Sequence, residues 1–361
     1  MNILWVGKTP ETGNAGDEVF DQQLIEACVA QGATVDRVYP EPLSRLGQLS
    51  NFVLRGLPHN RARFASARNH FALGQAARRH HVAVVSMEQF DELLLHLPLP
   101  AIPILHNITS LAVPSIMPHN PLAAFAARRA RHWEERVYRS GRLGAVAVLS
   151  RRDEAYLRGL TTGATVLFTP PGMPPLVPLA QDAKLKQELV LSGSYVWFPK
   201  RRDVIAFARD YAAVADRLPI VADGLPPKAA ALLLPRAAPS GPAGSAIRFG
   251  LIPDRFVAGH KLKTGYYLAN NAIVLSFADV TEDFADIPDH DFFIRQIGDA
   301  REIGRHVAAV AAEEPRRLRA RLETFKQRCA EVFSWQRSAR SLLAAASSLT
   351  GTTRLGASVG D

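Results

Sequence analysis

The chain has little cysteine and no long hydrophobic run, and each absence excludes a class of protein. Its 361 residues include 2 cysteines, Cys28 and Cys329, far apart in segments typical of helices. They provide neither a disulfide framework nor the spacing of a metal site. No apolar run approaches the roughly 18–20 residues that a membrane-spanning helix needs. Residues 1–7 lack a basic leader and are typical of a first strand, so we expect a reduced, cytoplasmic protein.

Complete nucleotide-binding loops are missing as well. Gly7-Lys8-Thr9 lacks the earlier glycine that a phosphate-binding loop requires. Gly13 and Gly16 do not complete a dinucleotide fingerprint, because no acidic ribose partner is placed to help them. The histidines and carboxylates show no convincing metal-ligand spacing. We therefore predict no metal and no cofactor.

The length and the order of the apolar runs predict two α/β domains. A chain of 361 residues, 47% of them hydrophobic, exceeds what one core usually supports, so two domains of roughly 150–180 residues are expected. Strand and helix patterns alternate, which predicts parallel sheets covered by helices. The expected strands are 2–6, 34–38, 81–86, 101–105, 144–149, 165–168, 188–191, 219–222, 246–249 and 272–275.

Between the two series of strands, residues 169–178 contain five prolines and are expected to form a linker. The main expected helices are 17–30, one beginning near Pro121, 202–217, and a mainly helical region over 299–350. Residues 235–244 are expected to form a loop, and residues 351–361 a frayed tail.

Basic residues exceed acidic ones, which points to an anionic partner. The net charge is +9, and six arginines with no Asp or Glu lie between Arg55 and Arg79. Few aromatic residues are interleaved with them, so nucleic acid is not the expected partner.

A second group of arginines lies on the expected helix from Pro121. Helical spacing puts Arg128 and Arg131 on the face opposite the apolar residues. This face is either simply solvated or attaches the protein to an anionic membrane, where each basic residue adds about 1 kcal/mol. The predicted apolar face consists of Leu122, Phe125, Ala126, Ala130, Trp133 and Val137.

The best-placed polar pair of the chain is His106-Asn107. It follows the apolar strand 101–105, and ligands of open α/β sheets bind just beyond the carboxyl ends of the strands. His106 either takes part in chemistry there or only satisfies backbone groups at the strand end.

Two basic segments of the second half are candidates for binding a phosphate. Gly193 and Ser194 end a strand, and small residues let backbone N–H groups approach a phosphate that a cation such as Lys200 neutralises. The alternative for Lys200 is a solvated helix start. Lys261 and Lys263 flank Leu262 just before another expected helix.

Short motifs along nearly the whole chain resemble those of GT-B glycosyltransferases, closest in layout to bacterial family 4. Their order and spacing carry the resemblance. In the first half, the motifs are Pro-Ile-Leu-His-Asn at 103–107, Trp-Glu-Glu-Arg-Val-Tyr at 133–138, and the expected strand that ends in Ser-Arg-Arg-Asp over 144–153. In the second half, they are Leu-Ser-Gly-Ser at 191–194 with the aromatic residues that follow it up to 199, the expected helix and strand over 263–274, and Phe-Ser-Trp at 333–335.

The resemblance implies two Rossmann-like parallel-sheet domains facing a cleft, with a C-terminal helix that crosses back. We expect an acceptor-binding domain over 1–175, a nucleotide-sugar-binding domain over 176–335, and the crossing helix and tail over 336–361. The implied activity is transfer of a hexose from a nucleotide-diphosphate sugar, a co-substrate, to a lipid-linked or polysaccharide acceptor. The resemblance implies a cytoplasmic protein. One interpretation attaches it to the inner face of the cytoplasmic membrane.

The resemblance also implies roles for individual residues. His106 and Asn107 contact the donor sugar as catalytic residues, and the loop with Gly13, Asn14 and Gly16 lies between acceptor and donor sugars. Arg128 and Arg131 form a membrane or acceptor surface. A fixed cation stabilises the leaving diphosphate; Lys263 is the preferred residue for this role and Lys261 is the alternative. The expected donor-binding residues are Gly193, Ser194, Lys200, Lys261, Lys263 and Thr264.

The chain departs from the family 4 pattern at Ala258 and Tyr266, where members often carry two glutamates. Three alternatives therefore stay open. They are an inverting, glucuronosyltransferase-like GT-B enzyme, a GT-B-fold sugar-nucleotide epimerase with more carboxylates at its site, and a non-catalytic homologue that binds glycans.

Overall fold

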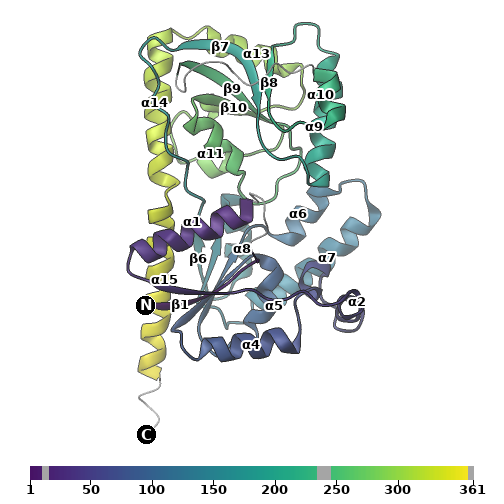
Figure 1. The fold of residues 1–361 in the computed structure, drawn as a ribbon, viewed down its shortest axis with the longest axis vertical. Helices are drawn as coiled ribbons and strands as arrows, with labels where there is room; N and C mark the ends of the chain where they lie inside the picture. The colour runs from purple at the N-terminus through teal and green to yellow at the C-terminus, as the bar shows by residue number, and fades with distance from the viewer. Residues whose placement is uncertain (10–15, 234–244, 357–361) are drawn as a thin grey trace. The chain divides into compact units, whose positions relative to one another are not determined.

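The computed structural model describes residues 1–9, 16–233 and 245–356 (Figure 1). It divides into two compact units. The first consists of Met1–Pro171, Ala258–His260 and Ser334–Asp361, and the second of Gly172–Val257 and Lys261–Phe333. Each unit contains one parallel sheet, as the alternating pattern predicts.

The sheet of the first unit has six strands in the order β2-β1-β3-β4-β5-β6, all parallel. Its central strands are continuous apolar runs that are buried on both faces, as a sheet covered on both sides requires. The strands are β1 (Asn2–Val6), β2 (Thr34–Val38), β3 (Val82–Ser86), β4 (Ala101–Leu105), β5 (Ala145–Val148) and β6 (Thr165–Phe168).

Helices cover both faces of this sheet. On one face, α1 (Gly16–Ala30) and the C-terminal helix α15 (Trp335–Gly356) share a core in which Phe20 and Leu342 are buried. The core of the other face includes residues of several shorter helices. The remaining elements are α2 (Arg45–Leu54), α3 (His59–Ala62), α4 (Ala67–Ala77), η1 (Glu88–Phe90), α5 (Asp91–Leu94), α6 (Thr109–Ile116), α7 (Pro121–Tyr138) and α8 (Arg151–Leu160).

The second unit has five parallel strands in the order β11-β10-β9-β7-β8. The strands are β7 (Lys184–Leu191), β8 (Ile220–Ala222), β9 (Ala246–Ile252), β10 (Ala272–Ser276) and β11 (Ile294–Gln296). The helices are α9 (Phe198–Ala212), α10 (Pro227–Leu233), α11 (Leu262–Ala269), η2 (Glu282–Phe284), α12 (His290–Phe293), α13 (Glu302–Ala311) and α14 (Pro315–Val332).

The structure confirms the predicted α/β class with two parallel sheets, and it corrects several details. The expected helix 202–217 runs from Phe198 to Ala212, because Pro199 fits the first helical turn, where no backbone N–H is needed. Helix α15 extends to Gly356, so the helical region is longer than the predicted 299–350. The predicted loop 235–244 lies outside the described residues. In the described part of the chain, no helix is long and apolar enough to span a membrane.

The predicted apolar face of α7 is only partly correct. Ala130, Trp133 and Val137 are buried, whereas Leu122 is 70% and Phe125 is 50% exposed. Both exposed residues lie in the first two turns, before the part of α7 that joins the hydrophobic core of the first unit. Helical periodicity does not reveal where along its length a helix leaves the core.

Candidate functional site

His106 lies immediately after β4, at the carboxyl end of the first sheet, and is 8% exposed. Its Nε2 atom is 3.0 Å from the hydroxyl oxygen of Ser86, the last residue of the neighbouring strand β3. The Ser86 hydroxyl donates a hydrogen bond to Asp21 on α1. The ends of two parallel strands and a helix therefore hold one imidazole in place.

Three carboxylates surround this imidazole. Asp17 Oδ1 is 3.7 Å from Nδ1 of His106, and Asp21 Oδ1 is 3.9 Å from Nε2. Burial disfavours the charged ring, but the nearby carboxylates of Asp17, Asp21 and Glu88 outweigh burial and raise the pKa of His106. Both ring nitrogens thus face oxygen atoms, as a protonated imidazole requires.

Two of these carboxyl groups are themselves perturbed. Burial raises the pKa of Glu88 and of Asp21, although the positive charge of His106 opposes the shift in each case. A titratable cluster of this kind at the carboxyl end of parallel strands is a candidate for proton transfer or for hydrogen bonding to a polar substrate. Sequence reasoning placed His106 here but missed Ser86, Asp21 and Glu88.

The backbone at His106 is in close contact with Gly259. This glycine has a φ of +57°, and a Cβ atom on it would lie 1.9 Å from the carbonyl oxygen of His106. A larger residue at 259 would therefore displace the end of β4. Asn107, half-buried, follows in the same bend.

The loop predicted between the acceptor and donor sugars is described only at its end. Gly13 and Asn14 lie outside the described residues. Gly16 is exposed and is the first residue of α1, one position before Asp17. Its predicted role stays a prediction.

The second unit places a half-buried lysine, Lys263, whose ammonium group is buried, at the carboxyl end of β7. The chain leaves β7 through Gly193, whose φ is +119°, and the Nζ atom of Lys263 lies 4.2 Å above the ring of Tyr195. A Cβ atom on Gly193 would be 2.6 Å from Cε of Lys263, so a glycine is needed for this approach. Within the described residues, this ammonium group has no hydrogen-bond partner. Burial lowers the pKa of Lys263 to about 8.

A second lysine is paired next to it. Lys261 donates a hydrogen bond to Asp254 Oδ2 at 3.0 Å and lies 3.8 Å above the ring of Phe256. Burial lowers the pKa of Lys261. Burial alone would raise the pKa of Asp254, but the positive charges of Lys261, Lys263 and Lys200 outweigh it and lower this pKa. Asp254 therefore compensates Lys261 but leaves Lys263 without a direct counter-charge.

Four buried polar atoms of this region lack hydrogen-bond partners in the part of the chain that the structure describes. Buried polar groups are nearly always paired in proteins, so such a group of atoms indicates a place that a ligand or water completes. The atoms are Lys263 Nζ, Tyr195 Oη, Thr264 Oγ1 and Asp254 Oδ1. We call Gly193, Tyr195, Asp254, Lys261, Lys263 and Thr264 the lysine site.

The structure thus groups most of the predicted donor-binding residues. Lys200, on the first turn of α9, acts electrostatically on Lys261 and Lys263, whereas Ser194 is exposed. Tyr195 and Asp254 were not predicted, because a single tyrosine or a single aspartate does not form a recognisable sequence motif. The roles of the predicted residues stay predictions.

The predicted membrane residues lie on the surface of α7. Arg128 is exposed, and Arg131 is 3.3 Å from Glu135 on the same helix. This arrangement is compatible with both interpretations of the arginine face.

Solved structures with the same fold are known. Sucrose-phosphate synthase from Thermosynechococcus elongatus has a TM-score of 0.60 and 12% identity, covering 98% of this chain and 100% of that one. The UDP-forming α,α-trehalose-phosphate synthase from Burkholderia vietnamiensis has a TM-score of 0.59 and 11% identity, covering 97% and 99%. An E. coli structure described as trehalose-6-phosphate bound with UDP-2-fluoro glucose has a TM-score of 0.52 and 10% identity, covering 96% and 99%.

These structural neighbours are GT-B glycosyltransferases. The chain has the GT-B fold. No family model matches it, and no curated protein matches its sequence.

Proposed function

We propose that this GT-B protein is a glycosyltransferase that moves a sugar from a nucleotide-diphosphate sugar to an acceptor. The observation that carries the proposal is the buried ammonium group of Lys263, which has no hydrogen-bond partner among the described residues. Burying an uncompensated charge costs several kcal/mol. A site that holds such an unpaired positive charge at the carboxyl end of a parallel strand is suited to an anionic ligand. In this fold, a diphosphate is such an anion.

The lysine site would act mainly on the leaving group. As the bond between sugar and phosphate breaks, negative charge accumulates on the diphosphate, and a fixed cation stabilises that charge more than it stabilises the ground state. The unpaired hydroxyls of Tyr195 and Thr264 would donate hydrogen bonds to the same oxygens.

His106 and its carboxylates would act on the sugar. A protonated imidazole donates hydrogen bonds and can orient sugar hydroxyls, as the predicted role requires. In an inverting reaction, Asp17 or Asp21 would instead accept the proton of the acceptor hydroxyl.

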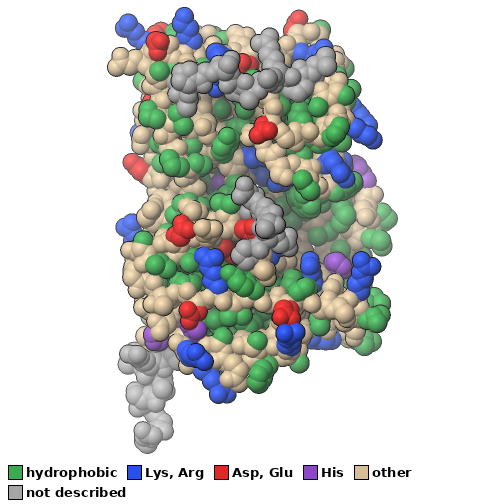
Figure 2. Space-filling model, viewed as in Figure 1, with side chains coloured by type: hydrophobic (Ala, Val, Ile, Leu, Met, Phe, Trp, Pro, Cys, Tyr) green, Lys and Arg blue, Asp and Glu red, His purple; other side chains and the backbone are tan. Residues whose placement is uncertain are grey.

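The acceptor proposed here is lipid-linked or a polysaccharide precursor, with the protein on the cytoplasmic face of a membrane. Support comes from α2, where Leu46, Leu49, Val53 and Leu54 are each more than half exposed. Arg129 of α7 contacts the ring of Phe52 and so joins the two helices. In Figure 2, hydrophobic and basic side chains lie side by side over the region where Figure 1 labels α2. Such a mixed surface suits an anionic bilayer.

The donor test is a thermal-shift screen with uridine, guanosine and thymidine diphosphate sugars. A bound ligand raises the unfolding temperature by mass action, so one nucleotide class should stabilise the wild-type protein. The same shift should disappear in Lys263→Met and persist in Lys184→Met, which changes an exposed lysine at the other end of β7. No shift with any nucleotide sugar would contradict the proposal.

A second candidate function is epimerisation of a nucleotide sugar, and the carboxylates around His106 favour it. An epimerisation that removes a proton from the sugar ring while the diphosphate leaves, and then returns both, needs several titratable groups at one site, as Asp17, Asp21 and Glu88 provide. The two functions differ in their need for an acceptor. Conversion of the donor sugar to its epimer without any acceptor would favour the epimerase, and no change without acceptor the transferase.

A further inference from the structure

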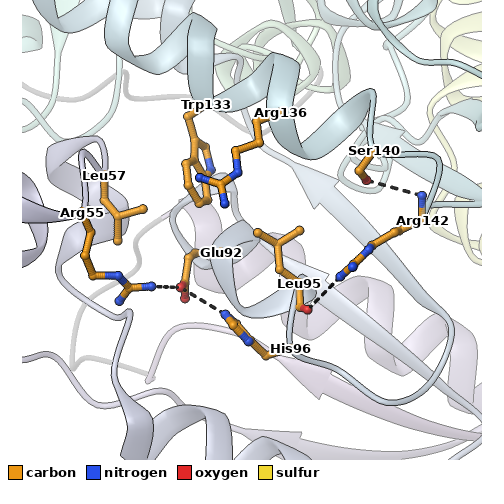
Figure 3. Close-up of a pocket in the computed structure, with 9 residues that line it drawn as sticks. All are labelled: Arg55, Leu57, Glu92, Leu95, His96, Trp133, Arg136, Ser140 and Arg142. Atoms are coloured by element: carbon orange, nitrogen blue, oxygen red, sulfur yellow. Dashed lines mark hydrogen bonds and ion pairs between the residues drawn. The ribbon is translucent and has the colours of Figure 1, made fainter.

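Figure 3 shows the residues that line a cavity of about 430 Å³ in the first unit. Leu95 and His96 belong to the segment that leads into β4, and Ser140 and Arg142 to the segment that leads into β5. His106, in contrast, follows the carboxyl end of β4. The cavity is therefore separate from the His106 site. Its lining residues are Arg55, Leu57, Glu92, Leu95, His96, Trp133, Arg136, Ser140 and Arg142.

Positive charge dominates the lining. Three arginines face one carboxylate, and that carboxylate, Glu92, is 2% exposed and lies 2.6 Å from Arg55. Arg136 lies over the ring of Trp133, and Arg142 donates to the carbonyl oxygen of Leu95 at 3.3 Å. In the described ranges, neither Arg136 nor Arg142 forms an ion pair. The positive charge of each is therefore not neutralised by a carboxylate and can attract an anionic ligand.

The same place also contains a potential metal cluster. The ligand atoms of His70, Glu92 and His96 all lie within 4.8 Å of one another. A divalent cation there would have to displace the Arg55 guanidinium from Glu92. It would then share the cavity with three positive charges, a repulsion that few ligand bonds offset. The electrostatics favour an anion over a metal ion.

We propose that this cavity binds a phosphate ester, with Arg136 and Arg142 donating to the phosphate oxygens. Planar guanidinium groups match the geometry of phosphate and form charge-assisted hydrogen bonds. Trp133, Leu57 and Leu95 provide an apolar wall for the carbon skeleton of the ester. The proposal does not depend on the glycosyltransferase activity, because it concerns binding alone.

The phosphate ester could come from a lipid headgroup or from a soluble metabolite. Arg55 directly follows α2, whose last residue, Leu54, is 80% exposed. The exposed apolar helix therefore leads into the cavity, which makes a phospholipid headgroup reachable. A soluble sugar phosphate offers the same phosphate without an acyl chain.

The experiment measures binding of three probes to the full chain. Calorimetry with glucose 6-phosphate and with inorganic phosphate tests the soluble source, and sedimentation with phosphatidylglycerol vesicles, against phosphatidylcholine vesicles, tests the lipid source. We expect at least one anionic probe to bind. Arg136→Gln and Arg142→Gln should each weaken that binding about tenfold, as expected for loss of a charge-assisted hydrogen bond.

Arg139→Gln is the matched control, because Arg139 lies between these two arginines in the sequence, is exposed and does not line the cavity. It removes the same charge and should change binding less than twofold. Unfolding temperatures of all three variants verify that they fold. Equal effects of the three variants, or no binding of any probe to the wild-type protein, would overturn the proposal. So would binding of zinc ions that His96→Ala abolishes while phosphate binding is absent.

Discussion

Each of the two units has a buried cationic group at the carboxyl end of a parallel strand, but the charges around these two groups differ. His106 follows β4 and is surrounded by Asp17, Asp21 and Glu88. Lys263 lies against the end of β7, where Asp254 is already bonded to Lys261. Burial disfavours the charge on both side chains. The pKa of His106 is nevertheless raised, whereas the pKa of Lys263 falls to about 8.

The difference shows that neighbours, rather than burial, decide what each cation can do. His106 has its counter-charges within the protein and can stay protonated without a ligand. Lys263 has none in direct contact and gains most when an anion arrives. The first site is therefore suited to orienting a polar, uncharged group such as a sugar, and the second to holding a diphosphate.

The largest expected effect comes from removing the imidazole. His106→Ala should lower the turnover of sugar transfer about 100- to 10,000-fold, the range for loss of a positioned acid or base. Nucleotide affinity should stay within twofold, because the lysine site is untouched. Steady-state kinetics and calorimetry measure the two quantities, with His119→Ala, at an exposed position, as the control. An unimpaired turnover would remove His106 from the mechanism.

Removing the lysine should weaken donor binding and also lower turnover, because Lys263 is proposed to hold the diphosphate both before and during its departure. Lys263→Met should weaken binding of the nucleotide-diphosphate sugar about 10- to 100-fold, since hydrogen bonds to charged groups contribute about 1.5–3 kcal/mol. Lys184→Met should leave the affinity unchanged. A Lys263→Met protein that binds the donor as tightly as the wild type would break the proposed division of roles.

The pH dependence of donor binding provides a third test. The anion favours protonated Lys263, so binding raises the pKa of this residue. Affinity should be constant well below pH 8 and should fall about tenfold per pH unit above it, until the pKa of the bound state is passed. Calorimetry between pH 6 and about pH 9.5 measures the curve, and Lys263→Met should flatten it. A wild-type affinity that does not decline above pH 8 would contradict the assignment.

The smallest expected effect concerns the membrane surface. Arg128→Glu with Arg131→Glu reverses two charges on α7, and each basic residue near an anionic bilayer contributes about 1 kcal/mol. Binding to phosphatidylglycerol vesicles should fall about tenfold or more in low salt, while donor affinity stays the same. Vesicle binding that does not change would support the solvated-face interpretation.

Much of the fold follows from local patterns, but the sites follow only in part. Continuous apolar runs such as 101–105 predict buried parallel strands, and a polar residue after such a run predicts a site at the sheet edge. This reasoning finds His106 and the lysines.

The partners of these residues come from distant parts of the chain. Asp21 reaches His106 because α1 packs over the sheet, and Asp254 reaches Lys261 through the segment after β9. The cavity that contains Arg136 and Arg142 is lined by residues of α5 and α7 and of the segments that follow α2 and precede β5. No local periodicity encodes such contacts, and so sequence reasoning missed them.

The most direct test of the account is the pKa of Lys263 itself. Its ε-carbon resonance, labelled with carbon-13 and assigned through Lys263→Met, can be followed by NMR from pH 6 to about pH 11, without and with a saturating nucleotide diphosphate. We predict a pKa of about 8 in the free protein and a higher value in the complex. An ordinary lysine pKa in the free protein, or no change on saturation, would contradict the claim that this lysine binds the diphosphate.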